Sequence, residues 1–443
     1  MTPPTATTEG AGTPDAPDAD WAAAFSYLPP VLLRTAQLKP HLSPPWIEPL
    51  EGTLVFADIS GFTAMSERLT EMGREGAELL TNIINRYFSR ILEIAQAHGG
   101  TNVKFGGDAL LLLFTGERHA NHAVATAHRI EAATRRFPAV RVGRDRIRLS
   151  MHVGVHSGAL WSAAAGMPGR RMQHFILGSQ ASRVAEVESA AGAEVLVSPD
   201  THRILDPLGR VEPAGPYYRI LEAAQSRSRA VSETPPAPPT EQTREELLAY
   251  LPPPVLHRLR SRQAEAGVEG EHRKVSVMFV HLVGVNELLE QDGPSALLSQ
   301  LQQYLSLVLD SAERYGGFLL GNDISALGIK LILVFGAPLA HEQDAANALR
   351  LGLELARGLP RMGLALRHQI GIHSGFVFAG EVGSPLRRDY TVMGDAVNLA
   401  ARLMGAAPAG QVLISRAIGQ EAGPGFILKE MAPIQVKGKK APV

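Results

Sequence analysis

The chain of 443 residues contains no cysteine. Disulfide bonds, cysteine-ligated zinc sites and thiol nucleophiles are therefore excluded, and a reducing compartment is compatible with the composition. Charge of one sign is not in excess either: 43 Lys and Arg against 44 Asp and Glu give a formal net charge of −1. A non-specific polyanion binder normally carries a basic excess, so we expect no nucleic-acid partner.

Long apolar runs are also absent. No stretch approaches the roughly 20 apolar residues that a membrane-crossing helix needs. The first twenty residues are rich in Pro, Thr, Ala and Asp and do not resemble a signal peptide. We therefore expect a cytoplasmic protein without a membrane span. The 45% apolar and 20% charged residues are typical of a globular chain with two or three domains.

The chain contains an internal repeat. The segment LVFADISGFTAMSE at 54–67 matches VMFVHLVGVNELLE at 277–290, so Asp58 faces His281 at an offset of 223 residues (281 − 58). Two further segments agree closely, HVGVHSG at 152–158 and QIGIHSG at 369–375. The sequence thus predicts two related domains.

The two copies have diverged in complementary ways. The first keeps the acid Asp58, whereas Asn398 and Arg402 of the second copy correspond to Ser182 and Glu186 in the first. Two folds that share one working site at their interface would diverge in this manner. We divide the chain into a disordered tail at 1–20, a helical lead-in at 21–50, a first domain at 51–224, a Pro-rich linker at 225–246, a second lead-in at 247–272 and a second domain at 273–443.

Each copy has the hydrophobic pattern strand, helix, strand, strand, helix, strand, followed by an arm and closing strands. This order predicts an α+β fold with a ferredoxin-like layer in each copy and two helices on one face of its sheet. The first copy is expected to have strands at 54–59, 102–105, 109–114 and 146–156 and helices at 75–98 and 119–137; the second is expected to have helices at 296–315 and 344–359 and strands at 330–335 and 367–373.

Two carboxylates belong to neighbouring strands of the first domain. Asp58 ends the first strand, and Asp108 lies in the turn GGD at 106–108. Mg²⁺ prefers oxygen ligands and usually takes one or two carboxylates together with substrate phosphates. The amides around Gly61 and Phe62, where a helix begins, could hold a polyphosphate. The alternative is that Asp58 caps that helix and Asp108 is an ordinary turn residue.

Asn398 and Arg402 of the second domain are four residues apart and would share one helix face. An amide and a guanidinium pointing together suit a ribose oxygen and the charge of a phosphorane. The alternative is an amphipathic helix whose polar face meets solvent.

These segments together resemble class III nucleotidyl cyclases. The resemblance rests on FADISGF at 56–62, KFGGDA at 104–109 and VNLAAR at 397–402. The tandem arrangement is similar to soluble adenylyl cyclases, in which two different catalytic domains form a head-to-tail pseudo-dimer with one active and one degenerate site. The resemblance implies that Asp58, Asp108 and the Ile59 carbonyl hold two Mg²⁺, for which Mn²⁺ can substitute.

The resemblance also assigns substrate contacts. Asn398 would orient the ribose, Arg402 would steady the pentacovalent phosphate, and Thr391 would read adenine. Either Arg170 or Arg171, and either Lys437 or Lys439, would bind the triphosphate. The expected adenine-contacting lysine aligns near Ser325 or Leu327, and the nearest lysine is Lys330, which is either a shifted equivalent or a residue within a strand.

Lys104 lies in the degenerate half, where a matching lysine of soluble cyclases helps to form a bicarbonate site. Arg183 is the arginine nearest to the aligned position of its partner, so bicarbonate regulation is a hypothesis.

The sequence thus predicts a monomeric adenylyl cyclase that converts ATP to 3′,5′-cyclic AMP and pyrophosphate at one asymmetric site. The alternative is a non-catalytic pseudo-cyclase that binds nucleotide or bicarbonate and regulates an attached module. A diguanylate cyclase is disfavoured because the turn reads GGDAL, and an RNA-binding sheet is disfavoured because exposed aromatic platforms are lacking.

Overall fold

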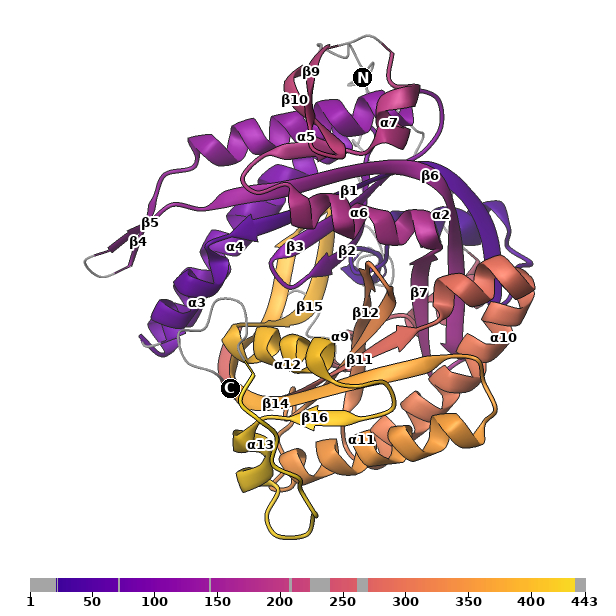
Figure 1. Ribbon diagram of the computed structural model, residues 1–443, viewed down its shortest axis with the longest axis vertical. Coiled ribbons are helices and arrows are strands. Elements are labelled where there is room, and N and C mark those ends of the chain that lie inside the picture. The colour runs from indigo at the N-terminus through magenta and orange to yellow at the C-terminus, as the bar shows by residue number, and fades with distance from the viewer. Residues whose placement is uncertain are drawn as a thin grey trace, which may run out of the picture.

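The computed structural model describes residues 21, 23–70, 72–142, 145–206, 209–223, 240–260 and 270–434, and it has two α+β lobes (Figure 1). The predicted tail, most of the predicted linker and the closing segment with Lys437 and Lys439 lie outside these residues. In the part of the chain that the structure describes, no helix has the length and apolar character needed to cross a bilayer.

The first lobe contains an eight-stranded sheet in the order β2-β3-β1-β6-β8-β10-β9, with β7 also paired to β6, and a separate β4-β5 hairpin. Its elements are β1 (Trp46–Ser60), α3 (Phe62–Thr70), α4 (Arg74–Gln96), β2 (Thr101–Gly106), β3 (Ala109–Phe114), α5 (His119–Arg136), β4 (Val140–Val142), β5 (Asp145–Ile147), β6 (Ser150–Met167), β7 (Arg171–Leu177), α6 (Ser179–Ala190), β8 (Val195–Val197), α7 (Pro199–Ile204), β9 (Gly209–Ala214) and β10 (Tyr217–Ala223).

The second lobe repeats the central order as β12-β13-β11-β14-β15, with β16 paired to β14. Its elements are β11 (Glu271–Val283), α10 (Val285–Arg314), β12 (Phe318–Ser325), β13 (Gly328–Phe335), α11 (Asp344–Arg361), β14 (Arg367–Ser384), β15 (Arg387–Met393), α12 (Asp395–Ala406), β16 (Val412–Ile414) and α13 (Arg416–Glu421). The shared order β2-β3-β1-β6 and β12-β13-β11-β14 confirms the ferredoxin-like class.

The strands are of two kinds, short buried strands inside a sheet and long strands that extend into an arm. All six residues of β3 are buried, because this strand lies inside its sheet with apolar residues on both faces. The strands β6 and β14 run well past the predicted ends at residues 156 and 373, since each leaves the sheet to pair with β7 or β15 in a projecting arm. Small residues dominate the extension of β6, and the apolar pattern gives no sign of it.

The lead-ins form short helices, α2 (Pro30–Leu38), α8 (Glu241–Leu248) and α9 (Pro253–Arg260). The hydroxyl of Thr240 accepts a hydrogen bond from the Thr243 amide, so α8 begins inside the stretch predicted as linker. Leu32 and Val255 are buried in one apolar cluster, so the two lead-ins pack together.

The lobes pack head to tail. The long helix α4 of the first lobe lies on β14 and β11 of the second, where the Asn85 side chain accepts a hydrogen bond from the Gly383 amide at 2.9 Å. In the reverse direction α10 lies on β6, where Gln302 accepts from the Gly166 amide at 2.9 Å. Figure 1 shows both helices reaching from their own lobe to the other. This reciprocal contact confirms the predicted intramolecular pseudo-dimer.

Candidate active site

A cavity of about 230 Å³ lies where the two lobes and both lead-ins meet. The hairpin β2–β3 forms one side, and β12–β13, β15 and α12 form the other. Seven residues that the sequence marked line it: Phe62, Lys104, Asp108, Arg171, Lys330, Thr391 and Asn398. Residues from distant parts of the chain thus share one space.

Asp58 and Asp108 lie on adjacent strands. Asp58 is paired in register with Ala109, the residue that follows Asp108. Burial raises the pKa of Asp108 well above its usual range, and the charge of Asp58 raises it further, while a backbone hydrogen bond opposes the shift. The two acids therefore repel each other in a partly dehydrated place.

This donor set fits a divalent cation. Two carboxylates on adjacent strands, with the pKa of Asp108 raised, concentrate negative charge that a hard cation would neutralise. Within the described residues no cluster of three or more His, Asp or Glu could hold a metal ion. Any Mg²⁺ here would consequently need further oxygen ligands, such as the phosphates of a nucleotide.

The turn after Asp58 leads directly into α3. Gly61 adopts a φ of +87°, which glycine tolerates without strain, and its carbonyl accepts from the Met65 amide at 3.1 Å. Phe62 lines the cavity, whereas the Ile59 side chain is buried in the core of the lobe. The structure thus places the helix start beside the acids.

Thr391 and Asn398 enter the cavity from the second lobe. Thr391 is buried on β15, and Asn398 lies in the first half of α12. Arg402 is half-buried one helical turn beyond Asn398 and does not line the cavity, although its neighbour Ala401 does. Helix α12 contacts α3, and Asn398 lines the cavity together with Phe62 and Asp108 of the first lobe.

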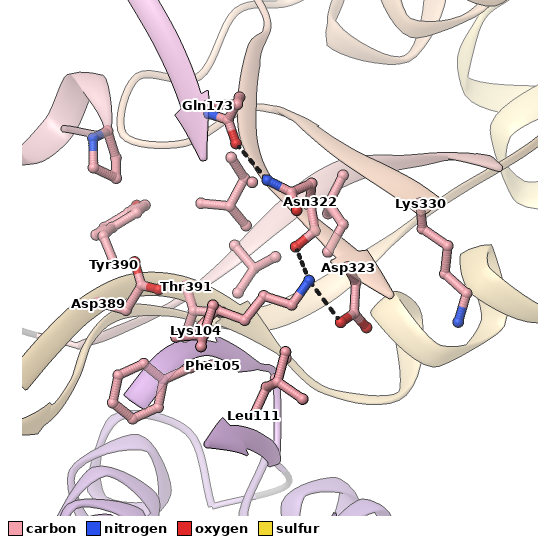
Figure 2. Close-up of a pocket in the computed structure, with 18 of the residues that line it drawn as sticks. Lys104, Phe105, Leu111, Gln173, Asn322, Asp323, Lys330, Asp389, Tyr390 and Thr391 are labelled. Carbon is pink, nitrogen blue, oxygen red and sulfur yellow. Dashed lines mark hydrogen bonds and ion pairs between the residues drawn. The ribbon is translucent and has the colours of Figure 1, made fainter. Parts of the chain in front are cut away.

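The sequence offered three positions for the predicted base-contacting residue: Ser325, Leu327 and Lys330. The Ser325 hydroxyl is hydrogen-bonded to His281 Nε2 at 2.9 Å, and Leu327 is 64% exposed in the hairpin turn. Lys330 lies on β13 between Asp323 of β12 and His281 of β11, and it lines the cavity (Figure 2). Of these three positions, only Lys330 reaches the shared space.

The two arginines that were candidates for binding the triphosphate lie in different surroundings. Arg170 is exposed and forms ion pairs with Asp310 and Glu313 of α10, away from the cavity. Arg171 lines the cavity and donates hydrogen bonds to the carbonyl oxygens of Leu319 and Leu320, both at 3.2 Å. Burial lowers the pKa of Arg171 to about 10.

Lys104 and Arg183 are not brought together. The Lys104 ammonium donates to the Asn322 carbonyl at 2.9 Å and pairs with Asp323 at 3.1 Å (Figure 2). Arg183 lies exposed on α6 and pairs with Asp200 at 3.1 Å. The Lys104 contacts cross from the first lobe to the second, so this lysine acts as an interlobe contact.

The second lobe has a histidine at the position of Asp58. His281 stands where Asp58 stands in the first lobe, and its ring nitrogens are hydrogen-bonded to Gln369 at 3.0 Å and Ser325 at 2.9 Å. Burial lowers the pKa of His281, which favours the neutral ring. Ser182, the counterpart of Asn398, accepts a hydrogen bond from Asn286 at 2.9 Å. In these contacts, neutral side chains of the protein are hydrogen-bonded to one another.

Sequence reasoning missed Asp389, which lines the cavity two residues before Thr391. Burial raises the pKa of Asp389 to about 6 against the attraction of Arg387 and Arg171. The alternation of residues 387, 389 and 391 on one strand was the available signal.

The chain matches the family described as "Adenylate and Guanylate cyclase catalytic domain" over residues 50–218 and 268–443. It is 25% identical to adenylate cyclase type 10 of Homo sapiens over 444 residues, which covers 90% of this chain and 26% of that protein. An uncharacterised protein of Mycobacterium tuberculosis is 35% identical over 138 residues, covering 30% of this chain and 23% of that protein. The chain spans about a quarter of the length of these relatives.

Among solved structures, a class III adenylyl cyclase-like ATP-binding protein from Pseudomonas aeruginosa has a similar fold, with a TM-score of 0.60, 13% identity and 85% of each chain covered. Both halves of the present chain match the catalytic-domain family, and its two lobes have the fold and pairing described above. The chain therefore belongs to the adenylate and guanylate cyclase catalytic-domain family, as a tandem of two class III cyclase domains.

Proposed function

We propose that the protein is an adenylyl cyclase that converts ATP to 3′,5′-cyclic AMP and pyrophosphate at the cavity between its lobes. One observation carries this proposal: Asp108 of the first lobe and Thr391 and Asn398 of the second line the same cavity. A cytoplasmic location and a monomeric state remain predictions.

The reaction is a single displacement within the nucleotide. The ribose 3′-oxygen loses its proton and bonds to the α-phosphorus, while the bond from that phosphorus to the bridging oxygen of the β-phosphate breaks and pyrophosphate leaves. Divalent cations held by Asp58, Asp108 and the Ile59 carbonyl would supply charge neutralisation and lower the pKa of the 3′-hydroxyl. Catalysis would otherwise consist of positioning and charge compensation.

The chain's own residues would divide that work. Asn398 orients the ribose, and Arg402, four residues later on the same helix face, steadies the charge on the pentacovalent phosphorus. Arg402 would have to turn its guanidinium toward the cavity when the nucleotide binds. Lys330 and Thr391 contact the base from β13 and β15, and Arg171 contributes positive charge for the phosphates.

A matched pair of substitutions tests the assignment. Asn398→Ala should lower cyclic AMP formation by on the order of 100-fold, because a group aimed at the reacting centre is lost. Ser182→Ala removes the counterpart side chain in the degenerate half and should leave the rate within about twofold of wild type. Product would be measured with ATP and with GTP in Mg²⁺ and in Mn²⁺. Equal rates in the two variants would refute the site.

Asp108→Asn is a further substitution to be measured in the same assay. It should abolish product with either cation, since a carboxylate oxygen and one negative charge are removed. If wild type binds ATP but forms no cyclic nucleotide with either cation, the non-catalytic alternative is the correct one.

A further inference from the structure

A largely buried carboxylate on the second lobe has partners in three parts of the chain. Glu381 of β14 accepts hydrogen bonds from the Tyr27 hydroxyl and from Arg258 at 3.1 Å, and it forms an ion pair with Arg388 at 3.0 Å. Arg258 also donates to the Tyr27 oxygen. Tyr27 belongs to the first lead-in, Arg258 to α9 of the second, and Arg388 to β15. The network thus ties both lead-ins to one arm.

Most of this network is withdrawn from solvent, although the Arg388 side chain is 28% exposed. The side chains of Arg258 and Glu381 are 8% and 16% exposed, and Tyr27 is 4% exposed. Removing one partner from such a network leaves a dehydrated charge without compensation, which costs far more than the loss of a surface ion pair. The geometry of the arm should therefore depend on each member.

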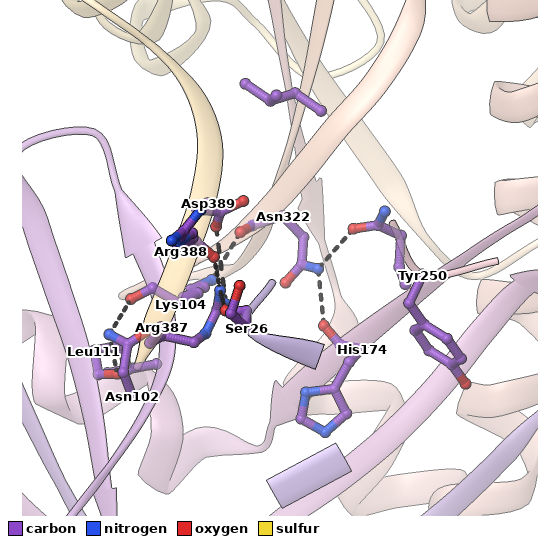
Figure 3. Close-up of polar contacts among 12 residues, drawn as sticks. Ser26, Asn102, Lys104, Leu111, His174, Tyr250, Asn322, Arg387, Arg388 and Asp389 are labelled. Carbon is purple, nitrogen blue, oxygen red and sulfur yellow. Dashed lines mark hydrogen bonds and ion pairs between the residues drawn. The ribbon is translucent and has the colours of Figure 1, made fainter. Parts of the chain in front are cut away.

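The arm so held is the one that presents Thr391. Glu381 is paired in register with Tyr390, the residue before Thr391. The Arg388 amide donates to the Ser26 carbonyl at 2.7 Å, so the first lead-in also holds the outer edge of β15 (Figure 3). Tyr27 lines the same cavity as Thr391. Contacts from the two lead-ins therefore hold β15, which forms one wall of the cavity.

The opposite arm has the same backbone contact but no carboxylate at the position of Glu381; there the Arg171 guanidinium donates to the Tyr250 carbonyl of the second lead-in. The Met172 amide donates to the Ala249 carbonyl at 2.7 Å, as Arg388 does to Ser26. Gly166 pairs with Met172 and Gly383 pairs with Arg388, both glycines having positive φ, so the two arms can be superposed residue by residue. On that basis Glu381 corresponds to Ala164 (383 − 381 = 166 − 164) and Arg388 corresponds to Met172.

We propose that Tyr27, Arg258 and Glu381 are positioning residues, which hold β15 so that Thr391 faces the nucleotide base; this inference rests on the proposed function. The carboxylate network lies on the arm that would read the substrate, and the other arm has Ala164 and Met172 at the positions of Glu381 and Arg388. Both lead-ins lie outside the two segments that match the family, so the site extends beyond the matched domains.

The structural part of the test needs no substrate. Tyr27→Phe removes the hydroxyl and keeps the ring, and Tyr250→Phe makes the same change at the counterpart, 223 residues on (250 − 27). Hydrogen–deuterium exchange of 387–393 should be about 10-fold faster in Tyr27→Phe than in wild type, because a hydrogen bond to a charged group is lost. Exchange of 171–177 should not change. Unchanged exchange at 387–393, or an equal effect of Tyr250→Phe there, overturns the proposal.

The functional part uses double-mutant cycles. Tyr27→Phe should raise KM for ATP about fivefold with kcat nearly unchanged, the signature of binding that is lost equally in the ground state and the transition state. Adding Glu381→Gln should cause little further change, because both substitutions break the same network. Combining Tyr250→Phe with Glu381→Gln should instead give the product of the two single effects. Independent effects in the first cycle overturn the proposal. A wild type that makes no cyclic AMP refutes the proposed function, and the exchange result then decides the positioning role alone.

Discussion

Asp389 is an acid placed among cations inside the cavity. Arg387 lies 3.9 Å from it, and Arg171 and Lys104 also act on it electrostatically, yet burial outweighs their attraction and raises its pKa to about 6. No motif marks this residue, because its role depends on two arms that meet only in the folded chain. A strand pattern could place it on the face of Thr391 but could not supply its neighbours.

The raised pKa of Asp389 gives stability a definite pH dependence. The folded state binds the proton more tightly than the unfolded chain, so the stabilisation is complete below the unfolded pKa near 3.8 and is lost as pH rises to about 6. Asp389→Asn should therefore raise Tm at pH 7.5 by on the order of 2 °C. The gain should vanish near pH 4 in thermal unfolding without divalent cations.

Asp206→Asn, in an exposed ion pair with Arg118, controls for the change in net charge. A gain for Asp389→Asn that does not vary with pH would show that burial of the charge is not its cause.

Helix α12 lies directly on glycine residues of β14, of which Gly371 is the most closely approached. A Cβ at Gly371 of β14 would collide with the Met404 amide and the Ala400 carbonyl, so the helix lies directly on the strand. Gly154 of β6 plays the same part under α6, where a Cβ would collide with the backbone of Glu188. The two positions form a matched pair in the two halves.

Gly371→Ala should displace α12 and lower cyclic AMP formation by roughly 10-fold or more, since a misplacement near 1 Å costs much of the rate. Both substitutions should lower the free energy of unfolding by about 1–3 kcal/mol. Gly154→Ala should nevertheless retain far more activity than Gly371→Ala. Both variants would be compared by thermal unfolding and by initial rate. Equal loss of activity at equal stability would mean that α12 has no special role.

The contact between β2 and β12 bears on the bicarbonate hypothesis. Lys104 already donates to a carboxylate and a carbonyl, and Arg183 is engaged elsewhere. We therefore expect cyclic AMP formation at fixed pH to be unchanged by millimolar bicarbonate. Stimulation in wild type that is lost in Lys104→Gln would show that an anion displaces Asp323.

The sequence predicts the central elements well because their hydrophobic periodicity is local. The helix predicted at 75–98 is α4, and the strand at 109–114 is β3. The arms and the lead-in contacts were not predictable in this way, since Ser26 and Arg388 are joined by a fold that brings together residues far apart in the chain. For the same reason the sequence could not decide between Arg170 and Arg171. They are adjacent in the chain, but Arg170 pairs with α10 and Arg171 lines the cavity.

At the scale of the whole molecule, each lobe supplies a different part of the cavity. Because both lobes lie on one chain and pack through α4 and α10, activity should require no second copy. Mixing Asp58→Ala protein with Arg402→Ala protein should therefore restore no activity. Rates per chain should also be independent of protein concentration. Recovery on mixing would show that lobes from two chains assemble a site.

The crossing of the lead-ins bears on how such a chain could arise. Residues before one copy are seated on the arm of the other, through Ser26 to Arg388 and through Ala249 to Met172. If the two lobes descended from a symmetric pair of identical chains, these contacts would have joined each chain to the arm of the other. Within the described residues, the contact of the first lead-in is accompanied by the Glu381 network, whereas that of the second is accompanied by the Arg171 guanidinium, which donates to the Tyr250 carbonyl. A chain that carries both lobes therefore does not need to keep the two contacts alike.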